Sequence, residues 1–144
     1  MMCDERKIID IYKCNYIKTD GEMYPLQKWY NELLDKRICD LDIFDVLRMI
    51  RQNEFTDIAI SRAIDILKKN PFAGDMYDGE LLEKLSTVST EKLAAYTDEI
   101  TNILANARIK NENFKWLDDE DRKNFEEVIT EFQKKISNTE KQLC

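Results

Sequence analysis

The feature that most constrains the fold is the recurrence of apolar residues at helical spacing along most of the chain. The residues that follow Pro25 place apolar side chains three, four, seven and eight positions apart, which gives an α-helix one apolar face. A second such face follows Asp118 and keeps the same period to its end. Only 3 Gly and 2 Pro occur in 144 residues, too few for the turns of a β-sandwich or barrel. The sequence therefore predicts an all-α protein.

Capping residues and prolines divide this pattern into about six to seven helices. Residues 8–12 could form a short helix, and the helix that opens near Thr56 should end at Asn70, because the residue before a proline avoids helical geometry. The connections are short, which favours a compact bundle of antiparallel neighbours in one domain spanning residues 1–144. Residues 1–24 are poorly defined by their pattern, and the polar residues 138–144 are expected to fray. The later helix starts are predicted at Pro25, after Asp42 as N-cap, at Thr56 or Asp57, at Asp78 or Gly79, after Thr90 as N-cap, and after Asp118 as N-cap.

The cysteines and the N-terminus bear on the cellular compartment. Cys3, Cys14, Cys39 and Cys144 have no C-x-x-C spacing, and the chain has no histidine, so we interpret them as free thiols in a reducing compartment in preference to a structural disulfide. The first residues lack the apolar stretch and cleavage site of a signal peptide. No window approaches the 18 or so apolar residues of a membrane span. These observations predict a cytoplasmic protein.

The formal charge of −7 is concentrated in the second half of the chain. Residues 1–72 carry 12 basic and 13 acidic side chains, whereas residues 73–144 carry 10 basic and 16 acidic ones. Binding to nucleic acid or to an anionic membrane needs clustered Lys and Arg, so neither partner is expected. An acidic surface instead suits a basic protein, although the charge could also serve only solubility.

No arrangement of residues points to catalysis, to a cofactor or to a metal. Histidine, the commonest general base, is absent, and no phosphate-binding, dinucleotide-binding or nucleophile-elbow motif occurs. The acids at 118–121 lie in the first turn of a predicted helix, where negative charge is favoured. Asp75, Asp78 and Glu80 do not have the spacing of a calcium loop. We therefore expect a binding protein and not an enzyme.

Three segments resemble the contact-dependent growth inhibition immunity proteins. They are LDIFDVLRMIRQN at 41–53, AISRAIDIL at 59–67 and NPFAGDMYDGELL at 70–82. The third matches the family pattern P-x-x-G-x-x-Y-x-G-[DE]-L-L and is the most specific part. The resemblance covers about residues 36–85, and it departs from the family at Ser61 and Asp78, where proline is common. Its structural signature residues are Arg48, Arg51, Gln52, Gly74 and Gly79.

The resemblance implies a helical protein that binds and neutralises the C-terminal toxin of a cognate effector. Such toxins are commonly nucleases and tend to be basic, which fits the acidic half of this chain. We expect the toxin's active site to be occluded, and we expect Arg48, Arg51 and Gln52 to brace the 74–82 loop from within. Trp116 could be an interface anchor or a core residue. The candidate toxin-binding residues are Asp75, Tyr77, Asp78, Glu80, Trp116, Asp118, Asp119, Glu120 and Asp121.

Three other functions are compatible with the same residues. An acidic helical module such as an anti-repressor or a nucleic-acid mimic would share the acidic surface but would protect against a DNA-binding protein. An enzyme with a carboxylate-only divalent metal site would gain thermal stability from the metal. A purely structural subunit would need none of these features.

Overall fold

The protein is almost entirely helical in a computed structural model that describes residues 5–12, 14–19 and 21–143, with side chains to residue 138. Within these residues no β-strand forms, and Lys7 and Arg37 make an isolated antiparallel bridge. The predicted all-α fold is confirmed. The α-helices are α1 (Ile8–Tyr12), α2 (Pro25–Asp35), α3 (Ile43–Gln52), α4 (Thr56–Lys69), α5 (Glu80–Ser86), α6 (Thr90–Leu93), α7 (Thr97–Asn111) and α8 (Asp119–Leu143), with 3₁₀ turns η1 (Ile38–Asp40) and η2 (Ala94–Tyr96).

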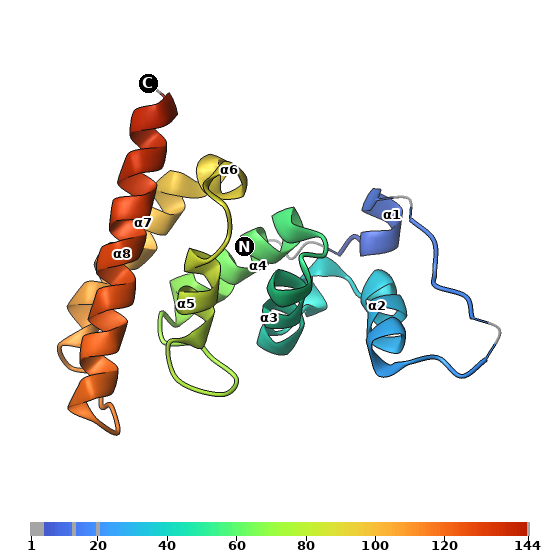
Figure 1. Ribbon diagram of the computed structural model, residues 1–144, viewed down its shortest axis with the longest axis horizontal. Helices are drawn as coiled ribbons and strands as arrows, with labels where there is room; N and C mark the ends of the chain where they lie inside the picture. Colours follow the sequence, from blue (N-terminus) through green and yellow to red (C-terminus); the bar gives the residue numbers. More distant parts are fainter. Residues whose placement is uncertain (1–4, 13, 20, 144) are drawn as a thin grey trace.

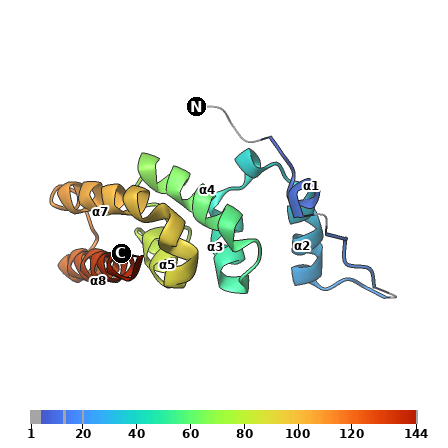
Figure 2. The same ribbon diagram turned by 90° about the horizontal axis from the view of Figure 1, so that it is seen from above.

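The helices follow one another along an elongated bundle (Figure 1). The α1–α2 pair forms one end, and α3, α4 and α5 lie in the middle. The long antiparallel pair α7 and α8 forms the other end, and a view from above shows the two side by side (Figure 2). α5 contacts α3, α4 and α8, so it connects the central helices to the terminal pair.

The predicted helix starts at Pro25, Asp42 and Asp118 are confirmed. Pro25 is the first residue of α2, where its missing N–H costs no hydrogen bond. The Asp42 carboxylate accepts the N–H of Asp45 at 2.9 Å and caps α3. Asp118 accepts the N–H of Glu120 at 3.1 Å at the start of α8. Local hydrogen-bond chemistry thus determines where these helices begin.

The segment after Val88 differs from the prediction. Ser89, not Thr90, is the N-cap, and the expected continuous helix is divided into α6, η2 and α7. The physical reason for the missed break is that a 3₁₀ turn is short. Leu93 before it and Ile100 after it are both buried, so buried apolar residues continue across the turn. The apolar spacing therefore does not mark the break. At the other end, α8 extends to Leu143, and the expected fraying of residues 138–144 stays a prediction.

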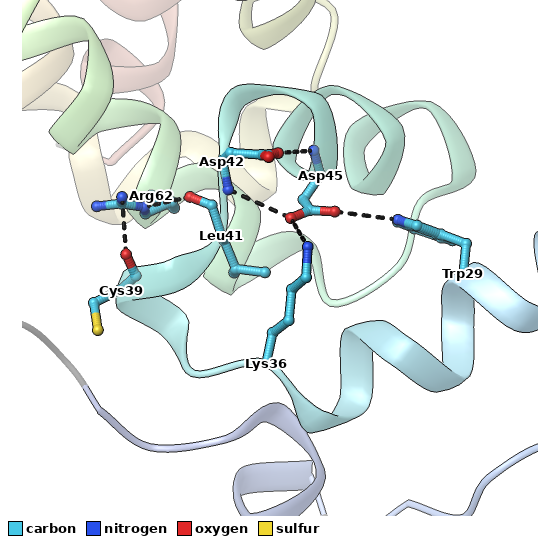
Figure 3. A network of polar contacts seen from close by, with 7 residues as sticks. All are labelled: Trp29, Lys36, Cys39, Leu41, Asp42, Asp45 and Arg62. Atoms are coloured by element: carbon cyan, nitrogen blue, oxygen red, sulfur yellow. Dashed lines mark hydrogen bonds and ion pairs between the residues drawn. The ribbon is translucent and has the colours of Figure 1, made fainter.

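A buried carboxylate joins α2 to α3 (Figure 3). Asp45 is only 2% exposed, and it accepts a hydrogen bond from Lys36 Nζ at 2.6 Å and a longer one from the Trp29 indole at 3.4 Å. Arg62 of α4 donates to the carbonyl of Leu41 at 2.8 Å in the same region. These bonds hold the connection between α2 and α3 against α4.

The prediction that all the cysteines are free thiols is wrong for Cys39, which is disulfide-bonded. Cys14 is free and half-buried. Cys3 and Cys144 lie outside the described residues. Spacing along the sequence cannot reveal which cysteines a fold brings within bonding distance, because this depends on tertiary structure.

Candidate functional site

A hollow with a volume of about 920 Å³ lies between the loop 74–79, α5 and the first half of α8. We call it the acidic groove. None of its lining residues, all in the described part of the chain, is Lys or Arg. Charges of one sign gathered in a hollow reinforce one another's field. The groove is therefore suited to a positively charged partner. Its six carboxylates are Asp75, Asp78, Glu83, Asp121, Glu127 and Glu131.

Exposed apolar side chains border these acids. Met76 is 80% exposed, Leu117 is fully exposed and Tyr77 is 46% exposed. Tyr and Met are enriched at protein interfaces, where large apolar groups supply most of the binding energy. Carboxylates next to exposed Met and Tyr are typical of a surface that another protein covers.

Two glycines determine the path of the loop. A Cβ on Gly74 would lie 1.8 Å from the carbonyl oxygen of Tyr77, so no residue with a side chain fits at position 74 in this loop conformation. Gly79 has φ of +85° and is the N-cap of α5, and a Cβ on it would lie 2.7 Å from the ring of Phe125. Both signature glycines thus have a steric reason for their position.

Glu80 holds the loop from beneath. It is 8% exposed, and its Oε1 accepts the N–H groups of Asp75 and Met76, each at 2.9 Å. This carboxylate is turned toward the loop backbone and does not line the acidic groove. Sequence reasoning grouped Glu80 with possible toxin contacts; its Oε1 orients Asp75 and Met76, and a contact between Glu80 and the toxin stays a prediction.

Tyr77 links the loop to α5. Its hydroxyl donates to the Glu83 carboxylate at 2.8 Å. Partial burial and then this hydrogen bond raise the pKa of Tyr77 to about 12. The phenol is therefore neutral at physiological pH and orients one of the groove acids.

Trp116 belongs both to the groove lining and to an aromatic cluster behind it. Its ring centroid lies 4.7 Å from that of Phe114, 5.3 Å from that of Phe125 and 5.7 Å from that of Phe72. Its indole N–H donates to the buried Asn111 at 2.7 Å. The half-buried ring thus packs beside the start of α8 and lines the acidic groove.

Lys135 connects the two helices that form walls of the acidic groove. Lys135 of α8 donates to the carbonyl of Ser86, the last residue of α5, at 2.7 Å and to that of Val88 at 2.6 Å. Burial lowers the pKa of Lys135. These bonds fix α5 relative to α8, so both walls of the acidic groove are held in register.

The structure brings together five of the sequence-predicted candidates. Asp75, Tyr77, Asp78, Trp116 and Asp121 all line the acidic groove. Asp118, Asp119 and Glu120 are exposed at the start of α8 and do not line it.

Sequence reasoning missed other parts of the groove. Glu83, Glu127 and Glu131 carry half of its carboxylates, and Met76 and Leu117 supply exposed apolar surface. A signal was available for α8, because residues 121, 124, 128 and 131 recur three or four apart and so share one helix face. Nothing in the sequence places that face beside the loop.

The three predicted bracing residues lie along the end of α3. The guanidinium of Arg48 lies 4.9 Å from the ring centroid of Trp29 and 6.0 Å from that of Phe44. Arg51 lies beside Asp75 and Met76 along a second hollow, and Gln52 is exposed. Their bracing of the loop stays a prediction.

A comparison with protein families decides the relationship. The model of the CDI immunity proteins matches residues 10–103, about two thirds of the chain. The chain belongs to the CDI immunity proteins. No curated protein matches the sequence. The expected resemblance is confirmed, and membership implies that this immunity protein binds a cognate CDI toxin.

The match also divides the acidic groove. It includes the loop 74–79 and α5, and it ends inside α7, so α8 and its groove acids lie beyond the matched residues. None of the helices in the part of the chain that the structure describes is long and apolar enough to span a membrane.

Proposed function

We propose that this immunity protein acts in the cytoplasm, without catalysis, by occupying the basic nucleic-acid cleft of a nuclease toxin with its acidic groove. The toxin would then be inhibited by one-to-one occlusion of its active site. The observation that carries the proposal is the hollow with six carboxylates and no basic lining residue. A nuclease cleft must neutralise phosphates with Lys and Arg. Carboxylates on a rigid scaffold carry the same negative charge as those phosphates, so they could take their place in the cleft.

The two kinds of lining residue would have different tasks. Exposed carboxylates accelerate the encounter with a basic partner and select its orientation. Apolar groups that become fully buried contribute most to the lifetime of a complex. Asp121, Glu127 and Glu131 would therefore affect the association rate, whereas Met76 and Tyr77 would affect the dissociation rate.

The first experiment is co-expression with the effector C-terminal toxin encoded immediately upstream, read out by growth and by co-purification. Rescue of growth together with a one-to-one complex is the expected result. The absence of both, with a toxin shown to be active, would contradict the assignment of this toxin as the partner. A nuclease assay on the purified toxin then tests occlusion. Loss of cleavage on complex formation, relieved by excess nucleic acid, is expected, whereas a complex that still cleaves would refute occlusion.

Matched charge variants test the groove itself. The triple variant Asp121→Asn/Glu127→Gln/Glu131→Gln removes three lining charges and should slow association about tenfold or more at low salt. The control is Glu91→Gln/Glu112→Gln/Glu126→Gln, which removes three exposed acids that do not line the groove. Equal effects of the two variants would show that only net charge matters, and would refute a role for the groove.

A further inference from the structure

A second hollow lies on the other side of the loop, between α3 and α5. This α3–α5 groove has a volume of about 570 Å³, and Phe44, Leu47 and Ile50 supply its apolar wall. Phe44 is 46% exposed although it is a large aromatic residue. An exposed aromatic beside an 80%-exposed methionine is more apolar surface than this part of the chain needs for its own packing.

The charge of the α3–α5 groove differs from that of the acidic groove. Arg51 and Lys84 line it, both exposed, and neither has an ion pair among the described residues. Glu80 also lines it, but its Oε1 is engaged by the two loop N–H groups. Asp75 is the other acid of this groove, and neither cation has an ion pair with it or with Glu80, so a chain with net charge −7 presents two available cations at this hollow.

The two grooves share a common edge. Asp75 and Met76 line both of them, so a protein seated on the acidic groove and covering the loop tip reaches the α3–α5 groove without a gap. Met76 would then lie at the centre of the contact, where an unbranched and adaptable side chain fits an irregular partner surface.

We propose that the α3–α5 groove is a second subsite for the toxin, and that it takes an apolar side chain flanked by a carboxylate. This inference rests on the proposed function. The apolar side chain would lie on Phe44, and the toxin carboxylate would pair with Arg51 and Lys84. The acidic groove would attract any basic protein. This subsite would select one toxin, because only a partner that presents basic groups to the acidic groove and a carboxylate to the α3–α5 groove is complementary to both.

Charge reversal separates local pairing from overall steering. Arg51→Glu makes an acidic protein more acidic, so steering alone predicts equal or tighter binding to a basic toxin. Pairing with a toxin carboxylate predicts the opposite, a dissociation constant about tenfold or more higher. Lys28→Glu makes the same charge change at an exposed position on α2, outside both grooves, and serves as the control. Both variants should keep the circular dichroism of the native protein, and Lys28→Glu should also keep its melting temperature.

The experiment measures toxin binding by both variants and by Phe44→Ala, and follows the methionine methyl groups by NMR. Weaker binding of Arg51→Glu and Phe44→Ala together with unchanged binding of Lys28→Glu would support the subsite. A shifted Met76 methyl signal beside an unshifted signal from the buried Met49 would show that the toxin covers the edge that the two grooves share. Unchanged binding by Arg51→Glu and Phe44→Ala, while the acidic-groove triple variant still binds weakly, would overturn the subsite and leave the proposed function standing. No complex with the native protein would overturn both.

Discussion

Replacement of Glu80 by alanine tests whether the loop 74–79 is held from beneath. The carboxylate accepts two backbone N–H bonds, each at 2.9 Å, and is 8% exposed. A hydrogen bond to a charged group contributes about 1.5–3 kcal/mol. Asp75 and Met76 are exposed, so water can reach their freed N–H groups, and the loss should fall below the combined value of the two bonds. We expect Glu80→Ala to lower the free energy of unfolding by about 2 kcal/mol.

Glu80→Gln keeps a carbonyl oxygen for the same two donors but removes the charge. Its expected loss is about 1 kcal/mol, because neutral hydrogen bonds contribute roughly half as much as charge-assisted ones. Glu127→Ala is the matched control, since it removes an exposed carboxylate and should change stability by less than about 0.5 kcal/mol. The order of stabilities should therefore be native, equal to Glu127→Ala, then Glu80→Gln, then Glu80→Ala.

Urea denaturation measures these differences, and hydrogen exchange locates them. The amides of Asp75 and Met76 should be protected in the native protein and should exchange rapidly in Glu80→Ala. Toxin affinity should fall in Glu80→Ala together with loop protection, because Glu80 would act by positioning its neighbours. Unprotected loop amides in the native protein, or a Glu80→Ala variant as stable as Glu127→Ala, would refute the reasoning.

Three further predictions follow from single contacts. The pKa of Tyr77 is raised to about 12, so the contribution of its hydrogen bond to stability is complete below pH 10 and decreases as the pH rises toward 12. The absorbance titration of the native protein minus that of Tyr77→Phe should show one phenol that ionises at unusually high pH. Glu83→Gln should lower the pH at which this phenol ionises. Gly79→Ala places a Cβ 2.7 Å from Phe125 at φ +85° and should cost at least about 2 kcal/mol by thermal melting, whereas Gly21→Ala, with no atom within 4 Å of its Cβ, should cost nothing measurable. Asp45→Ala removes the buried partner of Lys36 and the return bond to the Asp42 N–H, and should lower stability by about 2–3 kcal/mol in urea; a loss in Asp45→Asn equal to that in Asp45→Ala would show that the charge accounts for the whole effect.

Sequence reasoning succeeded where a structure is decided by neighbouring residues. The caps at Asp42 and Asp118 and the proline at position 25 act within a few residues, so the helix starts could be located from local chemistry. The break at η2 escaped detection because a 3₁₀ turn preserves the apolar period. The disulfide at Cys39 escaped it because the pairing depends on tertiary contacts.

The candidate site was only half predictable for the same reason. The loop acids Asp75 and Asp78 stand out in sequence because they flank glycines. Glu80 belongs to the same run, yet its carboxylate turns back to the loop backbone, and no sequence pattern separates this orientation from that of its neighbours. The acids of α8 become part of the site only through the packing of α8 against α5.

On the α8 wall of the acidic groove, the residues that stabilise the fold differ from the exposed residues that a partner could contact. On α8, the residues that attach the helix are buried apolar ones such as Phe125, Ile129 and Phe132, whereas the groove acids Glu127 and Glu131 are exposed and hold nothing in the core. Exposed substitutions of this kind change stability by only about 0.5 kcal/mol or less, so the groove charges of α8 can be altered at almost no cost to the fold. The loop offers no such freedom at Gly74, Gly79 and Glu80, because sterics and buried hydrogen bonds require those residues. Under the proposed function, the backbone of the loop would therefore have to keep its shape, whereas the exposed acids of α8 could be changed to fit a different toxin.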